Sequence, residues 1–135
     1  MKAQKKLLAI VLFLFALGVA GCTTAPTETI DSIPSGAQKL TTVDLPGRSG
    51  TYTDGSFSGW NDGHIILDVK IHSGTVNTIE IVNAAGDETV DSIKKSKGGI
   101  YETASHGYRS GREYKLNFVN SKNLTGSVDV YFIAD

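Results

Sequence analysis

The eleven residues from Asp54 to His64 hold the densest group of side chains that could bind a ligand. Asp54 and Asp62 each precede a glycine, a pairing typical of tight turns, and Trp60 and Asn61 lie just before the second turn. A tryptophan in a loop offers a large apolar face, and neighbouring polar groups can orient a sugar or a peptide. We therefore predict that any ligand contact involves Asp54, Trp60, Asn61, Asp62 and His64. The alternative is that Trp60 covers one end of the core.

The residues that could bind a metal do not follow a recognised pattern. The three histidines, which lie eight and 34 residues apart, match no compact zinc motif: His64, His72 and His106. In a strand, His64 and His72 would be ~26 Å apart. Calcium needs six to eight oxygens, whereas the loop offers only the side chains of Asp54, Asn61 and Asp62. We expect turn chemistry there, and no metal site.

Catalytic patterns are also missing. No Gly-x-Ser-x-Gly sequence occurs, and no spacing of Ser, His and Asp selects a triad. An aromatic platform for a glycan or a partner protein is one interpretation of the large rings, and packing in the core is the other: Tyr52, Trp60, Tyr101, Tyr108 and Tyr131. We predict a protein that is not an enzyme and has no catalytic residues.

The elements that must position these residues are β-strands. Residues 64–72 have a period of two, in which Ile65, Leu67, Val69 and Ile71 alternate with Asp68, Lys70 and His72, and similar alternation marks 76–83, 113–120 and 126–134. Shorter strands are expected near 40–45, 51–58 and 100–103, whereas 87–97 is predicted to be a short helix or a loop. Six to eight short strands with frequent turn signals predict an all-β, antiparallel β-sandwich, resembling a jelly roll, over residues 39–135.

The C-terminal third carries a resemblance to a known fold family. Residues 108–120 (YRSGREYKLNFVN) and 126–131 (GSVDVY) resemble the end of GOLD-like (Golgi dynamics type) jelly-roll domains and their prokaryotic extracellular relatives. Those domains carry a small-Gly-x-Tyr-x-Leu-x-Phe-x-Asn strand, a polar loop and a final alternating strand. The resemblance implies a binding or assembly module without an active site.

A second, partial resemblance lies earlier in the chain. Residues 52–59 (YTDGSFSG) and 73–81 (SGTVNTIEI) are similar to the opening of FMN-binding domains of exported flavoproteins. Those domains then attach the flavin through a Ser-Gly-Ala-Thr motif, which this chain lacks. Thr103-Ala104-Ser105 lies at roughly the right distance but has no preceding glycine. We predict no cofactor, and retain a small flavin- or metal-binding redox module as the alternative function.

The first 21 residues have the pattern of an export signal. A basic start is followed by 13 apolar residues, 7–19, which span about 20 Å as a helix and so fall short of the ~30 Å bilayer core. Val19-Ala20-Gly21-Cys22 then resembles the lipobox of bacterial and archaeal lipoproteins. The resemblance implies that Cys22, the only cysteine, becomes the lipid-bearing N-terminus of the mature chain. With Thr23 following Cys22, it implies an extracytoplasmic protein on the cell membrane or the outer membrane, anchored by acyl chains.

Residues 22–38 are rich in Thr, Ser, Pro and Gly, and we predict a lipidated N-terminus followed by a flexible linker. Three of the 13 basic residues lie in residues 1–21, which hold no acid, so the remaining chain has ten basic and 14 acidic residues and a net charge of −4. This charge is unsuited to nucleic acid and gives no overall attraction to an anionic membrane. The sequence thus predicts a lipid-anchored envelope protein with a binding or structural domain, whose partner is an unidentified envelope protein or glycan.

Overall fold

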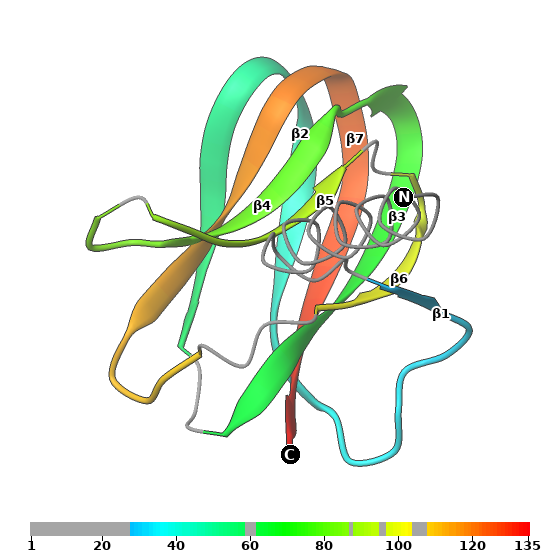
Figure 1. The fold of residues 1–135 in the computed structure, drawn as a ribbon. Coiled ribbons are helices and arrows are strands. Elements are labelled where there is room, and N and C mark those ends of the chain that lie inside the picture. The colour runs from blue at the N-terminus through cyan, green and yellow to red at the C-terminus, as the bar shows by residue number, and fades with distance from the viewer. Residues whose placement is uncertain (1–27, 59–61, 87, 95–96, 104–107) are drawn as a thin grey trace, which may run out of the picture.

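The computed structural model describes residues 28–58, 62–86, 88–94, 97–103 and 108–135. These residues form seven strands and no helix (Figure 1): β1 (Glu28–Ile30), β2 (Gln38–Ser58), β3 (Gly63–Thr75), β4 (Thr78–Asn83), β5 (Thr89–Lys94), β6 (Gly99–Glu102) and β7 (Glu113–Ala134). Every strand pairing is antiparallel. The prediction of an all-β, antiparallel fold is confirmed, with a strand number inside the expected range. Within the described ranges, no helix is long and apolar enough to cross a bilayer.

Strand β7 organises the sheet. One of its edges pairs with β2 over almost its whole length, from Ser58 opposite Glu113 to Gln38 opposite Phe132. Its other edge pairs with β4 in the first half and with β3 in the second half. The next row is formed by β5 beside β4 and β6 beside β3, and β1 adds to the far edge of β6. The result is one continuous sheet.

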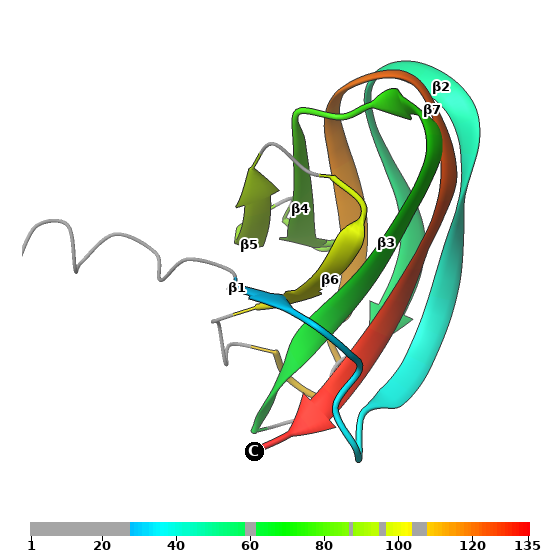
Figure 2. The same ribbon diagram turned by 90° about the vertical axis from the view of Figure 1, so that its right-hand side faces the viewer.

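The sheet folds over on itself along one line, which we call the crease. There, β2 and β7 lose regular register and bend, β3 gives way to β4, and the row of β5 and β6 is interrupted. All these bends lie at the upper end of Figures 1 and 2, and Figure 2 shows the strands descending from it in two layers. The crease comprises residues 46–52, 71–78 and 120–126, together with Lys94, Lys97 and Gly98.

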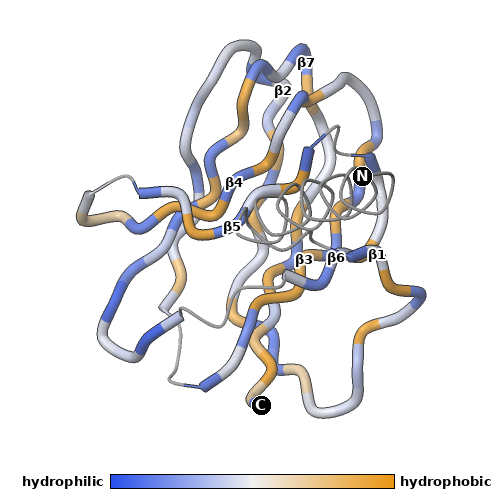
Figure 3. Tube along the Cα trace, viewed as in Figure 1, coloured by the Kyte–Doolittle hydropathy of each residue, from blue (hydrophilic) through white to orange (hydrophobic). Residues whose placement is uncertain are grey.

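The two layers bury a single core between them. Buried side chains alternate along the strands, as at Ile65, Leu67 and Val69 of β3, and those of both layers belong to one cluster. Figure 3 shows apolar residues recurring along the strands and more polar residues at the bends. Each buried aliphatic or aromatic side chain contributes about 1.5–3 kcal/mol before conformational entropy is subtracted. The predicted sandwich therefore takes the form of a curled sheet packed against itself.

Two glycines allow the backbones to approach closely at the crease. Gly126 has a φ of 137°, and a Cβ there would lie 1.9 Å from the carbonyl oxygen of Lys70. Gly74 has a φ of 82°, and its Cβ would lie 2.3 Å from the carbonyl oxygen of Asn123. No other residue fits either position without moving backbone.

The expectation of a short helix or loop over 87–97 is wrong for the described part of that segment. Residues 89–94 form β5, which pairs with β4, and Asp91 and Ile93 point inward. The early acids and late lysines suggested a helix dipole, but pairing with β4 and burial of Ile93 decide the structure.

The linker predicted over 22–38 is partly ordered. Residues 28–30 form β1 on the edge of β6, and β2 already begins at Gln38. Strands β2 and β7 are also longer than expected, because the turn signals at 46–47, 54–55 and 120–126 mark bends and bulges within continuous strands. The expected short strands near 40–45 and 51–58 are thus two parts of β2.

Candidate functional site

Two of the residues predicted to contact a ligand, Asp54 and His64, lie on two different strands. Asp54 lies in β2 opposite Leu116, and its Oδ1 accepts a hydrogen bond from the Gly55 amide at 2.8 Å, as turn chemistry requires. Asp62 has a φ of 61°, and His64 follows in β3 at the end of the molecule opposite the crease. Trp60 and Asn61 lie outside the described residues.

His64 is held between two carboxylates. Its Nε2 lies 2.7 Å from Oε1 of Glu102, and its Nδ1 lies 3.3 Å from Oδ1 of Asp135. The side chain is 12% exposed. The carboxylates contact opposite nitrogens of the ring, so the three groups do not converge on one point. In the part of the chain that the structure describes, no three potential ligands gather around a metal position. His64 therefore links β3, β6 and the end of the chain.

Of the other two histidines, only His72 lies within the described residues, and it is not beside His64. His72 lies exposed farther along β3, near the crease, and His106 is outside the described residues. The described geometry thus places His64 and His72 at opposite ends of one strand, as their spacing indicated.

A second polar cluster lies on the outer face of β2, β7 and β3. Asp129 accepts a 2.6 Å hydrogen bond from the Thr42 hydroxyl, and Lys39 and Lys70 lie 3.3 and 3.4 Å from its carboxylate oxygens. Burial alone would raise the pKa of Asp129, but the hydrogen bonds from Thr42 and Lys39 and the two positive charges outweigh it, so the pKa is lowered. Asp68, directly opposite Asp129, and Asp129 itself raise the pKa of Lys70. The cluster joins three strands.

A third polar pair lies inside the core. The Tyr108 hydroxyl donates to Oδ2 of Asp91 at 2.5 Å, and the two residues are only 1% and 7% exposed. Tyr108 also packs edge-on against Tyr114, with ring centroids 5.2 Å apart. Burial, and then the charge of Asp91, raise the pKa of Tyr108 well above its usual value. A tyrosine held neutral in this way stabilises the interior and does not transfer protons near neutral pH.

Tyr52 is also a core residue, but its hydroxyl has a different environment. Its ring stacks on Phe118 at 5.1 Å, and the Arg48 guanidinium lies 4.8 Å from its centroid on the outside. The Oη atom is buried and has no hydrogen-bond partner among the described residues. Tyr52 and Tyr108 therefore belong to the core. This agrees with the interpretation that the large rings pack in the core.

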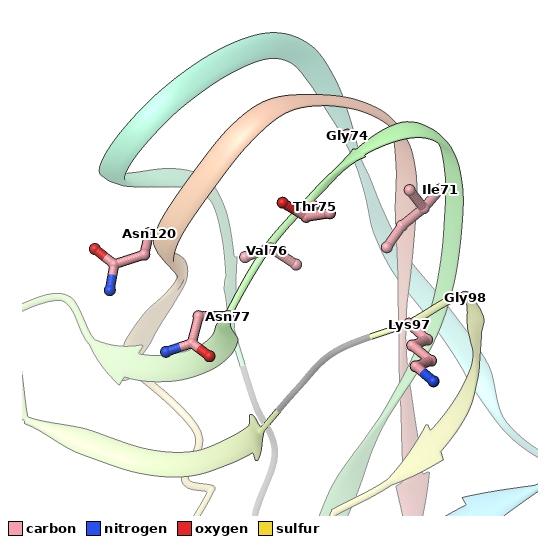
Figure 4. A pocket seen from close by; sticks show the side chains of 8 residues that line it. All are labelled: Ile71, Gly74, Thr75, Val76, Asn77, Lys97, Gly98 and Asn120. Atoms are coloured by element: carbon pink, nitrogen blue, oxygen red, sulfur yellow. The ribbon is translucent and has the colours of Figure 1, made fainter.

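An open hollow of about 530 Å³ lies at the crease, where β3 gives way to β4 (Figure 4). Its apolar part comes from Ile71 and Val76, while Figure 4 shows the carboxamides of Asn77 and Asn120 on one side and the Lys97 side chain on the other. Tyr101 fixes the backbone of Lys97, because its hydroxyl donates to the Lys97 carbonyl at 2.9 Å and lies 3.3 Å from the Lys97 amide.

Sequence reasoning missed this hollow. Its residues come from three separate parts of the chain, and each part by itself has only the composition of a turn. These parts come together because β7 pairs with β2, β3 and β4. No local sequence pattern encodes those long-range pairings.

The fold and these sites define a small, antiparallel all-β domain whose polar clusters connect its strands and whose crease carries an open polar hollow. No protein family, no curated protein and no solved structure matches the chain.

Proposed function

We propose that this protein is a lipid-anchored component of the cell envelope, whose β domain is a non-catalytic binding or structural module. The observation that carries the proposal is Val19-Ala20-Gly21-Cys22, which follows 13 apolar residues and contains the only cysteine of the chain. Two or more acyl chains on one residue give stable membrane attachment, whereas one chain gives only marginal attachment.

The position of β1 supports a domain held close to the membrane. Only residues 23–27 separate Cys22 from Glu28, where β1 begins. Six Cα–Cα steps reach at most about 20 Å. A lipid on Cys22 would therefore keep the β1 edge near the headgroups.

The polar clusters support a structural rather than a catalytic role. His64, Asp91 and Asp129 each contact partners on other strands or at the chain end, and these contacts hold the sheet together. A general acid or base needs a free atom that can reach a substrate. The ligand contact predicted at Asp54, Trp60, Asn61, Asp62 and His64 remains a proposal for the binding role.

The anchor is tested by replacing Cys22 with Ser and following the incorporation of labelled palmitate in growing cells. We expect label and membrane fractionation for the natural chain and for a Thr23→Ser control, and no label for Cys22→Ser. Incorporation of label into Cys22→Ser would contradict the proposal. A purified protein that carries a flavin absorbance or a stoichiometric metal would instead support the redox alternative.

A further inference from the structure

The crease is the basic end of an acidic domain. Its segments contain no Asp or Glu, although the chain after residue 21 has a net charge of −4. Four of its basic side chains are exposed: Arg48, Lys94, Lys97 and Lys122. None of the ion pairs among the described residues involves any of these four.

Acidic residues gather at the opposite end. Asp62 and Asp135 lie where β3 begins and β7 has ended, Glu102 lies beside them through His64, and Glu113 begins β7. Arg109 and Arg112 precede Glu113, so the opposite end carries charges of both signs, whereas the crease, at the upper end of Figure 1, carries basic side chains and no acidic ones.

The crease also offers the neutral donors that accompany anion binding. Asn77 and Asn120 carry carboxamides across the hollow from Lys97, and Thr75 adds a hydroxyl at the same hollow (Figure 4). Arg48 rests on the Tyr52 ring, so its guanidinium is held in place at the surface. Arginine and lysine side chains with amide and hydroxyl neighbours suit phosphate oxygens.

The length of the chain before β1 brings the bilayer within reach of this end. Glu28 lies opposite Glu102, and Gly98 at the rim of the hollow precedes Glu102 by four residues, about 13 Å along a strand. Residues 23–27 span up to about 20 Å, so the lipid on Cys22 can lie level with Gly98 at the rim of the hollow, although Glu28 itself lies beside Glu102. An anionic surface attracts the basic side chains of the crease over roughly 10 Å at 0.1 M salt.

We propose that the crease is a membrane-contacting face that binds the phosphate groups of anionic phospholipids in the bilayer that carries the anchor. This inference rests on the proposed lipidation of Cys22. The anchor makes the contact intramolecular, so that even weak pairing of Arg48, Lys97 and Lys122 with headgroups orients the domain.

The test uses the lipidated protein reconstituted in vesicles that contain a phospholipid with a headgroup nitroxide, which quenches nearby fluorophores. Because Cys22 is the only cysteine and its sulfur carries lipid, a new cysteine can be labelled selectively. His72→Cys places the dye on an exposed position of the crease, and Ala85→Cys places it on the exposed turn between β4 and β5. We expect quenching only at His72→Cys, only with phosphatidylglycerol present, and loss of quenching in concentrated NaCl.

Charge reversal provides a matched comparison. Arg48→Glu with Lys97→Glu and Lys122→Glu should abolish quenching at His72→Cys. The same charge change away from the crease, through Arg109→Glu, Arg112→Glu and Lys115→Glu, should leave it intact. Circular dichroism checks that each triple variant is folded. The salt dependence of quenching in the protein without these charge reversals tests the proposal independently of both triple variants.

Three outcomes would overturn the proposal. They are equal quenching at both dyes, quenching that is the same in pure phosphatidylcholine, and no quenching while the crease binds soluble polyphosphate. The palmitate experiment separates these failures from failure of the anchor, because label on Cys22 without quenching leaves the proposed function standing.

Discussion

The two buried tyrosines make opposite predictions for the same chemical change. Tyr52 buries a hydroxyl that has no partner among the described residues, whereas the Tyr108 hydroxyl donates to the buried carboxylate of Asp91. Replacing either residue with Phe removes one oxygen and keeps the ring. Tyr52→Phe should therefore raise the free energy of unfolding, and Tyr108→Phe should lower it.

The expected magnitudes follow from the contacts. An unpaired buried polar group costs about 1–3 kcal/mol, so we expect Tyr52→Phe to stabilise the domain by about 1 kcal/mol. For a domain of this size that is a rise in Tm of about 4 °C. Tyr108→Phe loses a hydrogen bond to a charged group and leaves Asp91 without that donor, which should cost about 2–3 kcal/mol.

The assay is urea unfolding of a soluble chain that starts at Thr23. Far-UV circular dichroism monitors the unfolding, once at neutral pH and once at alkaline pH. An unfolded tyrosine ionises near pH 10, whereas burial and Asp91 keep folded Tyr108 neutral at that pH. Ionisation then favours the unfolded chain, so stability is retained below about pH 10 and falls as the pH rises beyond it. Tyr108→Phe should reduce this alkaline loss.

Either tyrosine can refute the reasoning. A neutral or destabilising Tyr52→Phe would mean that the hydroxyl is solvated or paired. A Tyr108→Phe variant as stable as the natural chain, with the same alkaline profile, would mean that the pair with Asp91 makes no net contribution.

Three further predictions concern the binding loop, the core and the outer cluster. Trp60→Ala should abolish any ligand binding and shift Tm by only a degree or two if Trp60 is a contact residue, whereas a loss of about 3 kcal/mol or more in denaturant titration would make it a core residue. Phe118→Asp places an unpaired charge in the core and should unfold the domain, which circular dichroism would detect as loss of β signal; a folded variant would contradict the assigned inner face. Asp129→Asn should cost about 1 kcal/mol at neutral pH, because the contacts with Thr42 and Lys39 weaken. Since the pKa of Asp129 is lowered, its contribution is present above about pH 4 and lost on acidification, so the variant and the natural chain should converge there; parallel pH curves would exclude this cause.

The regular strands could be predicted because their pattern is local. Alternation from Ile65 to Ile71 is sufficient to specify which side of β3 is buried, and the structure buries Ile65, Leu67 and Val69 in the core. Ile66 lies between Ile65 and Leu67 and interrupts the alternation, and it is also fully buried. Local alternation does not contain that information.

The missed features depend on pairings between distant segments. The acids of this segment suggested the start of a helix, whereas Asp91 points inward and accepts a hydrogen bond from Tyr108, 17 residues later. The bends at 46–52 and 120–126 looked like ends of strands, because bulges and turns use the same glycine and asparagine residues. The candidate loop was predicted as one unit because its residues are adjacent in sequence, whereas Asp54 and His64 belong to different strands.

The central position of β7 has a consequence for how the chain is made. Its residues are the last 22 before Asp135, and they pair with β2, β3 and β4, with partners as distant in sequence as Gln38 and Phe132. Until they emerge from the ribosome, β2 has no pairing partner and the crease has no continuous strand to bend. Such distant contacts also make folding slow, on the order of milliseconds to seconds. A chain without β7 therefore lacks the strand that joins β2, β3 and β4 into one sheet, so formation of the sheet depends on this strand.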